Sequence, residues 1–217
     1  MRTPQVSIIL PTYNRADTIL RAVRSVQAQS FEDWELIVVD DGSTDNTHDL
    51  LAGVDDRIKL IRQANAGVYT ARNVGLAASR GRLLTFLDSD DAWRPHFLEL
   101  TTSFLNWSTD DHFVTTEFDQ DYGNGHVVAH DRYEISDQYP AVARAIGSAR
   151  LARPAGQKDD YLRVYDSCEA VGAWGQAAAT AAGQTEARLY RGQIFQHMRW
   201  GYLNWLPVTL LTRHALD

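Results

Sequence analysis

Short apolar runs alternate with helical patterns along the first half of the chain. The runs are rich in valine, isoleucine and leucine and stop at polar residues, which is typical of buried strands. The predicted strands are residues 6–10, 35–39, 57–61 and 82–87. The predicted helices are residues 16–29, 44–51, 68–79 and 92–107. Strands separated by helices favour right-handed crossovers, so we expect an α/β fold with a mostly parallel, Rossmann-like sheet flanked by helices.

The alternation ends in the middle of the chain. A strand is predicted over residues 112–118, and a turn signal precedes a predicted hairpin arm at residues 126–129. Residues 136–190 show no clear period, and residues 206–212 return to strand character. No internal repeat or linker separates a second domain, so we expect a single domain over residues 1–217.

The composition narrows the function classes. The 217 residues carry a net charge of -7, which argues against a nonspecific nucleic-acid binder because such proteins are basic. Lys59 and Lys158 are the only lysines, and no Gly-Lys-Ser/Thr sequence is present. The chain therefore lacks a P-loop, and it fits poorly to phosphatases that hold phosphate with a downstream lysine.

Cysteine content and hydropathy indicate the compartment. Cys168 is the only cysteine, so no internal disulfide is possible. No apolar window reaches the length of a membrane span, and no secretory hydrophobic stretch follows Met1. We expect a soluble chain without a membrane span, located in the cytoplasm or at the inner face of the membrane.

Three carboxylates follow the predicted strand at residues 82–87. Asp88, Asp90 and Asp91 stand where like charges repel and where partial burial penalises the charged forms. A divalent cation would neutralise the cluster, and all-oxygen ligands favour Mn2+ or Mg2+ over zinc. The alternative is structural: a solvated acidic loop, or an aspartate that caps the following helix.

Polar segments follow two further strands. Residues 11–15 come after the first strand and residues 40–45 after the second, where Ser43 or Thr44 is expected to cap the next helix. Each segment alone is ordinary turn chemistry. Because parallel strands end at the same edge of a sheet, we expect these segments to meet the carboxylates of residues 88–91 there, where open α/β sheets bind ligands.

At these residues the sequence resembles the family 2 glycosyltransferases, which have the GT-A fold. The resemblance is dense over residues 4–105 and faint beyond. The matching blocks are Val6-Ser-Ile-Ile-Leu-Pro-Thr-Tyr-Asn-Arg15, Val38-Val-Asp-Asp-Gly-Ser-Thr-Asp45, Asn65-Ala-Gly67, Ala71-Arg-Asn-Val-Gly75, Phe86-Leu-Asp-Ser-Asp-Asp91 and Trp93-Arg-Pro95. The resemblance implies a nucleoside diphosphate sugar donor, usually bound through a metal, and transfer of the sugar with inversion.

The resemblance also implies roles for single residues. Tyr13 would stack on the base, beside a pocket shaped by Pro11 and Thr12. Asp41 would accept a hydrogen bond from the base, which suits uracil and makes UDP the expected nucleotide. Asp90 would bind the metal directly. The remaining nucleotide-binding positions are Arg15, Gly67, Arg72, Asp88 and Ser89, with Asp88 also addressing the metal shell.

Inversion needs a general base that deprotonates the acceptor hydroxyl. In the family this base is a downstream Asp or Glu that follows a strand ending in basic residues, which residues 206–216 resemble. We expect the catalytic base to lie beyond the chain, with Asp160 as the weaker candidate inside it. The alternative function is a nucleotide-binding module without turnover.

The resemblance divides the expected single domain into two halves. Residues 1–107 would bind the nucleotide, and residues 108–217 would form an incomplete acceptor side. The expected acceptor is a carbohydrate or glycolipid in polysaccharide or glycoconjugate synthesis. The donor sugar, the acceptor's identity and the oligomeric state do not follow from the sequence.

Overall fold

The computed structural model consists of two compact units, Met1–Thr115 with Leu206–Asp217, and Thr116–Trp205. The described residues are 3–107, 113–115, 118–121, 127–130, 167–170, 188–191 and 209–213. Almost all of the described chain therefore belongs to the first unit, which carries every nucleotide-binding residue predicted from the sequence.

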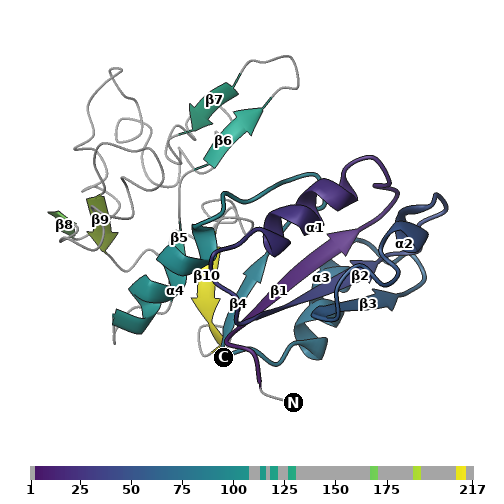
Figure 1. The fold of residues 1–217 in the computed structure, drawn as a ribbon, viewed down its shortest axis with the longest axis horizontal. Helices are drawn as coiled ribbons and strands as arrows, with labels where there is room; N and C mark the ends of the chain where they lie inside the picture. The colour runs from purple at the N-terminus through teal and green to yellow at the C-terminus, as the bar shows by residue number, and fades with distance from the viewer. Residues whose placement is uncertain are drawn as a thin grey trace, which may run out of the picture. The chain divides into compact units, whose positions relative to one another are not determined.

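The first unit contains a six-stranded sheet in the order β3-β2-β1-β4-β10-β5 (Figure 1). Its strands are β1 (Val6–Thr12), β2 (Trp34–Asp40), β3 (Ile58–Arg62), β4 (Leu83–Phe86), β5 (Phe113–Thr115) and β10 (Thr209–Thr212). β1, β2, β3 and β4 pair in parallel, whereas β10 pairs antiparallel with both β4 and β5. The predicted α/β fold with a mostly parallel sheet is confirmed.

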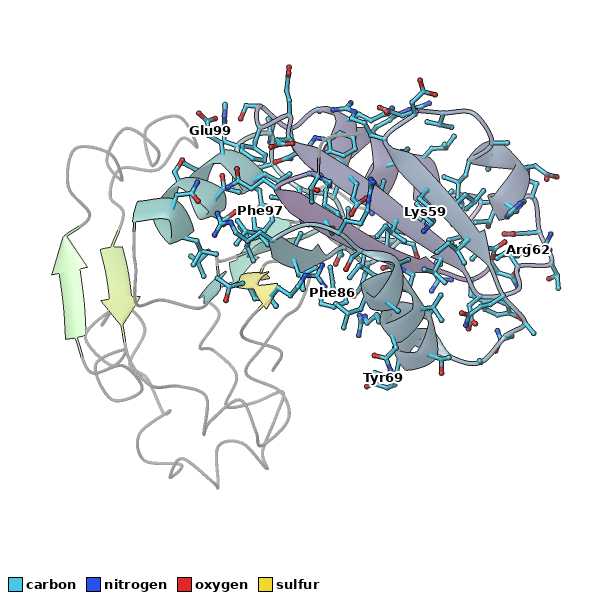
Figure 2. The ribbon with its side chains drawn as sticks, turned by 90° about the horizontal axis from the view of Figure 1, so that it is seen from below. Lys59, Arg62, Tyr69, Phe86, Phe97 and Glu99 are labelled. Atoms are coloured by element: carbon cyan, nitrogen blue, oxygen red, sulfur yellow. The ribbon has the colours of Figure 1, made fainter. Side chains whose placement is uncertain are left out.

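Helices cover both faces of this sheet (Figures 1 and 2). They are α1 (Ile19–Gln27), α2 (Thr47–Leu50), α3 (Val68–Ala78) and α4 (Phe97–Trp107). Every residue of β1 and β2 is buried, as the apolar runs predicted. Alternate residues of a strand face opposite sides of the sheet, and Ile37 and Val39 of β2 pack on one side with Ala71 of α3.

Close packing of α3 on β1 depends on Gly75. A Cβ at this position would lie 2.5 Å from Cγ2 of Ile9, a distance that real side chains do not tolerate. The helix therefore lies nearer to the sheet than a residue with a side chain at this position would allow. Its first turn is exposed instead, and Figure 2 shows Tyr69 pointing away from the sheet.

Three helices begin later than their patterns predicted. The segment expected to be helical over residues 92–107 starts at Phe97, because Pro95 disfavours a helical conformation at Arg94. The helices expected from residues 16 and 44 start at Ile19 and Thr47. The amides ahead of these two helices bond to side chains of a neighbouring loop or, for Arg15, to the first residue of α2.

The described part of the second unit consists of two antiparallel strand pairs. β6 (Phe118–Asp121) pairs with β7 (Val127–His130), and β8 (Ser167–Ala170) pairs with β9 (Arg188–Arg191). β7 matches the predicted hairpin arm. The strand predicted over residues 112–118 is split between the units, since β5 joins the large sheet and Phe118 begins β6.

The strand order reverses at β1. β2 and β3 lie on one side of this strand and β4 on the other, and β1 pairs with β4 only as far as Ile9 and Phe86. The next residues of the two strands lead into Pro11 and into the loop that carries Asp88. Ligands of open α/β sheets bind at such a reversal, outside the carboxyl ends of the strands. We call that side the carboxyl edge and the opposite side the amino edge.

Among the described residues, no helix combines the length and the apolar character needed to cross a bilayer.

Candidate functional site at the carboxyl edge

Four loops meet at the carboxyl edge of the sheet. They are the β1 loop (13–18), the β2 loop (41–46), the β3 loop (63–67) and the β4 loop (87–96), each named after the strand that it follows. The nucleotide-binding residues predicted from the sequence all lie in these loops, at the ends of the strands before them, or in α3. The topology thus brings them to one edge.

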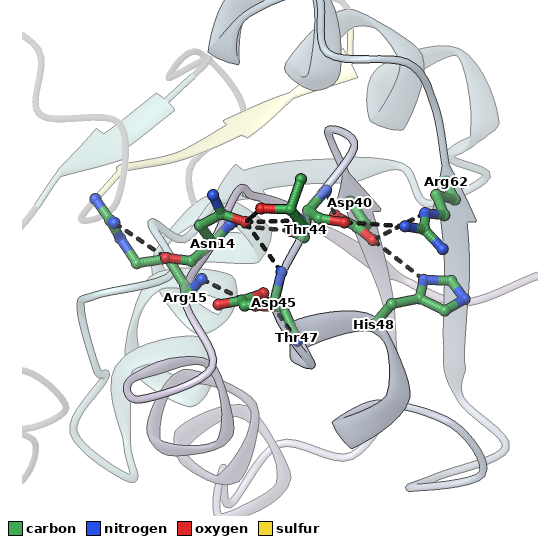
Figure 3. Close-up of polar contacts among 9 residues, drawn as sticks. Asn14, Arg15, Asp40, Thr44, Asp45, Thr47, His48 and Arg62 are labelled. Atoms are coloured by element: carbon green, nitrogen blue, oxygen red, sulfur yellow. Dashed lines mark hydrogen bonds and ion pairs between the residues drawn. The ribbon is translucent and has the colours of Figure 1, made fainter.

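Asn14 joins the β1 loop to the β2 loop (Figure 3). Its backbone N–H donates to Oγ of Ser43 at 3.0 Å. Its side-chain oxygen accepts the backbone N–H of Thr44 at 2.8 Å, and the Thr44 hydroxyl and the Asp45 N–H approach the same oxygen at 3.3 and 3.4 Å. Asn14 therefore uses both its backbone and its side chain to hold the two loops together.

A second set of hydrogen bonds links the β1 loop to the end of the β2 loop and to the first residue of α2. The Arg15 N–H donates to Oγ1 of Thr47 at 2.9 Å, and the Ala16 N–H donates to Oδ2 of Asp45 at 3.2 Å (Figure 3). Thr47 in turn donates its hydroxyl and its backbone N–H to Oδ1 of Asp45. The Thr47 hydroxyl hydrogen bond is the main cause that lowers the pKa of Asp45, so the carboxylate stays charged.

The predicted N-cap at Ser43 or Thr44 is wrong. The residue before α2 is Asn46, which makes no side-chain capping hydrogen bond. Ser43 and Thr44 bond to Asn14 of the other loop instead. A hydroxyl side chain can cap a helix or bond to another part of the chain, and here the contact with Asn14 replaces the cap.

Asp41 shapes the β3 loop. Its carboxylate accepts Nε2 of Gln63 at 2.7 Å and the backbone N–H groups of Ala66 and Gly67, both at 2.9 Å. Burial raises the pKa of Asp41, but these three hydrogen bonds outweigh it and leave the pKa below its ordinary value. Asp41 is thus a buried, charged group that fixes the start of α3.

Gly42 allows the β2 and β3 loops to approach each other. Its φ of 80° lies in the left-handed region, and a Cβ there would be 2.9 Å from the backbone N of Asn65. A residue with a side chain would be strained twice, by its backbone and by this contact. The Asp-Gly pair therefore serves a close contact between loops as well as a turn.

A buried carboxylate also stands at the end of β2. Asp40 is fully buried, and its Oδ1 accepts the Ser43 N–H at 2.9 Å. Its Oδ2 lies 3.2 Å from Nδ1 of His48 and 3.6 Å from Nε of Arg62 without a hydrogen bond to either (Figure 3). Arg62 donates to the Ser43 carbonyl at 2.9 Å, so Asp40 and Arg62 both hold the β2 loop in place.

Arg72 of α3 meets Asp88 of the β4 loop. Its Nη2 lies 2.7 Å from Oδ1 of Asp88, with the two side chains 17% and 30% exposed. The Nε of Arg72 is buried and makes no hydrogen bond. The ion pair joins two residues predicted to bind the nucleotide, and it leaves a donor of Arg72 unused inside the site.

Asp90 is the more exposed carboxylate of the Asp-x-Asp pair. Its side chain is 54% exposed and lies 3.7 Å from Nε of Arg15, which is beyond hydrogen-bonding distance. Arg21 of α1 donates to the backbone carbonyl of Asp90, which holds the loop without occupying the carboxylate. Arginines, rather than further carboxylates, therefore stand beside both Asp88 and Asp90.

The carboxyl edge fits a metal site completed by substrate. Within the described part of the chain, no three His, Cys, Asp or Glu side chains gather around one point. Mg2+ and similar hard cations are often held by one or two carboxylates, with water and substrate phosphates as the other ligands. The accessible oxygens of Asp90 suit such a site, whereas zinc would need more protein ligands.

Other predicted residues differ in their exposure. Pro11, Thr12 and Ser89 are buried, and Oγ1 of Thr12 has no hydrogen-bond partner. Tyr13 is 44% exposed, so its ring is accessible to a ligand. Asp160, the candidate catalytic base within the chain, lies outside the described residues.

Gln29 is a buried residue that sequence reasoning missed. Its Nε2 donates to the Arg94 carbonyl at 2.8 Å, and its Oε1 accepts the Leu98 N–H at 2.9 Å. The side chain at the end of α1 thus anchors the end of the β4 loop and the first turn of α4. Asn14, Asp45 and Gln63 were also missed, because polar residues in loops give no periodic signal.

Comparison with known proteins identifies a family. A family model described as glycosyl transferase family 2 matches residues 7–166. The UDP-Glc:alpha-D-GlcNAc-diphosphoundecaprenol beta-1,3-glucosyltransferase WfgD of Escherichia coli is 45% identical over 102 residues, covering 46% of this chain and 40% of the relative. The succinoglycan biosynthesis protein ExoO of Rhizobium meliloti (strain 1021) is 46% identical over 96 residues, covering 43% and 28%. The chain thus spans less than half of either relative.

Solved protein structures resemble this chain as well. The crystal structure of S. aureus TarS 1–349 in complex with UDP-GlcNAc has a TM-score of 0.54 at 27% identity, covering 60% of this chain and 38% of that one. The complex of the same protein with UDP has a TM-score of 0.53 at 27% identity. With the strand order, this likeness identifies the fold as GT-A, as predicted. Because the family model covers most of the sequence, including the loops of the carboxyl edge, the chain belongs to glycosyl transferase family 2.

Proposed function

We propose that the carboxyl edge binds a UDP-sugar and that the chain transfers the sugar, with inversion, to a hydroxyl acceptor. The observation that carries the proposal is the meeting of the four loops where the strand order reverses, in a member of a sugar-transferring family. The UDP-bound and UDP-GlcNAc-bound structures of TarS support the choice of UDP.

The base would lie between the β1 and β2 loops. The accessible ring of Tyr13 would stack on it, and Pro11 with Thr12 would shape the pocket beneath. The hydroxyl of Thr12 is buried in this pocket without a hydrogen-bond partner. A carboxylate has about four acceptor positions, so Asp41, which accepts three hydrogen bonds here, retains one for the uracil N–H.

The ribose and diphosphate would extend towards the β4 loop. Arg72 would face them together with Arg15 and the backbone near Gly67, since planar guanidinium groups suit phosphate. Asp88 and Ser89 would line the ribose side. The ion pair between Arg72 and Asp88 would hold both side chains in position before the donor arrives.

Asp90 would hold Mn2+ or Mg2+ against the diphosphate, with Asp88 in the metal shell. Bound there, the cation would supply Lewis-acid stabilisation of the leaving UDP. The role of the chain is then to present an accessible carboxylate at a fixed place, which the Arg21 contact with the Asp90 backbone supports. We assign no catalytic base among the described residues.

The acceptor would be a carbohydrate or glycolipid. The name of WfgD describes glucosyl transfer to a lipid-linked diphosphate sugar, and ExoO is named for succinoglycan biosynthesis. We therefore propose a role in polysaccharide or glycoconjugate synthesis, with residues 1–107 as the nucleotide-binding half of one glycosyltransferase domain and residues 108–217 on the acceptor side.

Calorimetric titration with UDP tests the proposal, using GDP and CDP as controls and with or without Mn2+. We expect UDP to bind more tightly than GDP or CDP and only weakly without the metal. Equal binding of all three nucleotides would overturn the base assignment, and metal-independent UDP binding would overturn the metal assignment. Slow hydrolysis of a UDP-sugar would separate an enzyme from a binding module.

A further inference from the structure

We propose that Asn14 is a positioning residue for the donor, which holds the ring of Tyr13 in its base-stacking place by anchoring the β1 loop on the β2 loop. The inference rests on the proposed function, because it needs a nucleotide base at this edge. Asn14 is proposed to contribute to donor binding through Tyr13, without touching the base.

The backbone of Asn14 has an unusual conformation. Its φ of 50° lies in the left-handed region, and Asn14 is the one non-glycine residue with a positive φ in the described part of the chain. Asparagine tolerates this region better than most residues, but a chain adopts it there only when neighbouring contacts favour it. This conformation turns the chain directly after Tyr13, so the contacts that hold it also hold the backbone on which Tyr13 stands.

The hydrogen bonds of the Asn14 N–H and of its side-chain oxygen come from the β2 loop. The Asn14 N–H donates to the Ser43 hydroxyl at 3.0 Å, and the side-chain oxygen accepts the Thr44 N–H at 2.8 Å. The Thr44 hydroxyl and the Asp45 N–H add longer contacts to the same oxygen. The side-chain oxygen therefore accepts most of the hydrogen bonds that join Asn14 to the β2 loop. A substitution by glycine removes this oxygen and still permits the left-handed backbone.

Tyr13 needs such an anchor because much of its side chain is open to solvent. Its side chain is 44% exposed, among the largest exposures of any large apolar residue in the described part of the chain. If the backbone were not held, the ring would spend part of its time in positions where it cannot stack on the base. The affinity for the nucleotide would fall in proportion to that time. The residue that holds the backbone then contributes to affinity without touching the ligand.

The same contacts contribute little to global stability. The bonds between Asn14 and Thr44 are exposed, so water replaces them when the side chain is removed. A residue that merely supported the fold would lower stability and leave the affinity of the folded protein unchanged. Asn14 is expected to do the opposite, and this difference makes the inference testable.

The test measures UDP affinity by calorimetry with Mn2+, and thermal unfolding by circular dichroism, for two variants. Asn14→Gly keeps the left-handed backbone and loses the side-chain oxygen, so we expect UDP to bind about tenfold more weakly. Asn14→Asp keeps an acceptor oxygen and tolerates the same φ, so its affinity should stay within about threefold of the wild type. An Asp variant as weak as the Gly variant would overturn the inference.

Asn106→Ala is the matched control. The Asn106 side-chain oxygen also accepts two hydrogen bonds near the surface, from Gln5 at 3.3 Å and Arg82 at 2.6 Å, but at the amino edge. We expect a similar small change in unfolding temperature and no change in UDP affinity. If Asn14→Gly is much less stable than this control, or binds UDP as the wild type does, the inference is overturned while the donor site stands.

A double-mutant cycle tests whether Asn14 acts through Tyr13. In a Tyr13→Ala background, Asn14→Gly should weaken UDP binding by less than about twofold, because there is no ring left to position. A full, additive loss would overturn the proposed route through Tyr13. A wild-type chain that binds no UDP would overturn the donor site and this inference together.

Discussion

The two edges of the central sheet treat buried charge differently. At the amino edge, Glu35 is 6% exposed, and each of its two oxygens accepts two hydrogen bonds. Ser7 and Arg80 are the donors, and the Ser7 hydroxyl also accepts the Gly81 N–H. The buried carboxylate is thus fully satisfied by groups of the protein itself.

At the carboxyl edge the satisfaction is incomplete. Among the described residues, the buried ionisable atoms without a hydrogen bond are Oδ2 of Asp40, Nδ1 of His48 and Nε of Arg72. All three lie at or beside the loops that meet there, although Oδ2 of Asp40 and Nδ1 of His48 are only 3.2 Å from each other. Neutral exceptions occur elsewhere, such as the indole N–H of Trp34 at the amino edge, but Arg57 stacks on that ring at 3.7 Å.

The difference separates stability from binding. Leaving a buried polar group unpaired costs about 1–3 kcal/mol, so a fold tolerates it where something else is gained. Full pairing of the Glu35 carboxylate at the amino edge favours a rigid junction of β1, β2 and the end of α3. Spare donors and acceptors at the carboxyl edge favour a ligand that completes them. Substitutions at the two edges should therefore change different quantities.

The largest expected effect is on binding, from Asp90→Ala. Loss of the proposed metal ligand should weaken UDP binding in Mn2+ by about 100-fold and abolish its metal dependence. Thermal stability should hardly change, because the side chain is 54% exposed. Asp56→Ala removes one exposed carboxylate before β3 at the amino edge and serves as the charge-matched control. Undiminished Mn2+ dependence in the Asp90 variant would refute the assignment.

The opposite result is expected from Glu35→Ala. Removal of this carboxylate takes the acceptor from the Ser7 hydroxyl and leaves the Arg80 N–H only its longer bond to Ser7, which should lower the free energy of unfolding by about 2–3 kcal/mol. Urea unfolding measures this change. UDP affinity at a temperature where the variant is folded should equal that of the wild type. A tenfold loss of affinity would show that the two edges are not independent.

The strands followed from the sequence because their signal is local. Apolar runs such as residues 6–10 and 35–39 are buried on both faces, and no competing pattern exists for them. The parallel direction of the predicted strands also indicated that the polar segments after them would meet at one edge of the sheet. The helix starts failed where tertiary bonds captured the first amides, as at Arg15 and Thr44.

The internal connections of the candidate site could not be predicted. Asp41 bonds to the backbone of Ala66 and Gly67, and Asn14 bonds to the backbone of Thr44. Backbone donors carry no mark in the sequence, and each pair is separated by 25 to 30 positions. The motifs thus indicated which loops form the site, while the geometry of the loops required the structure. The roles of single residues in binding stay predictions.

Gln29→Leu should have a smaller effect, on both the stability of the fold and the affinity for UDP. The amide joins the end of α1 to the β4 loop and to the Leu98 N–H, so its loss leaves the buried Leu98 N–H without its acceptor. We expect about 1–2 kcal/mol less stability and a UDP affinity reduced about threefold through the loosened loop. Gln29→Glu keeps the acceptor for Leu98 and should recover part of the stability. An unchanged UDP affinity would show that Gln29 does not hold the β4 loop in its binding position. The contacts of Arg15, Arg21 and Arg72 with that loop would then suffice.

The smallest effect is a difference in acid sensitivity between the edges. Burial raises the pKa of Glu35, but the Ser7 and Arg80 hydrogen bonds outweigh it and keep that pKa below its ordinary value of 4.5. Its contribution is therefore complete above pH 4.5 and is lost as the pH falls through the lowered pKa. The same sign holds for Asp41, whose lowered pKa starts from 3.8.

Urea unfolding between pH 3 and pH 7 measures this difference with Glu35→Gln and Asp41→Asn. The gap in unfolding free energy between wild type and Glu35→Gln should be constant above pH 4.5 and shrink below it. The gap for Asp41→Asn should persist to lower pH and shrink only below 3.8. If both gaps stay constant down to pH 3, the hydrogen bonds do not depend on the charged carboxylates. The amino edge would then be stabilised by shape and neutral bonds, and its contrast with the carboxyl edge would lie in the pairing of atoms rather than in charge.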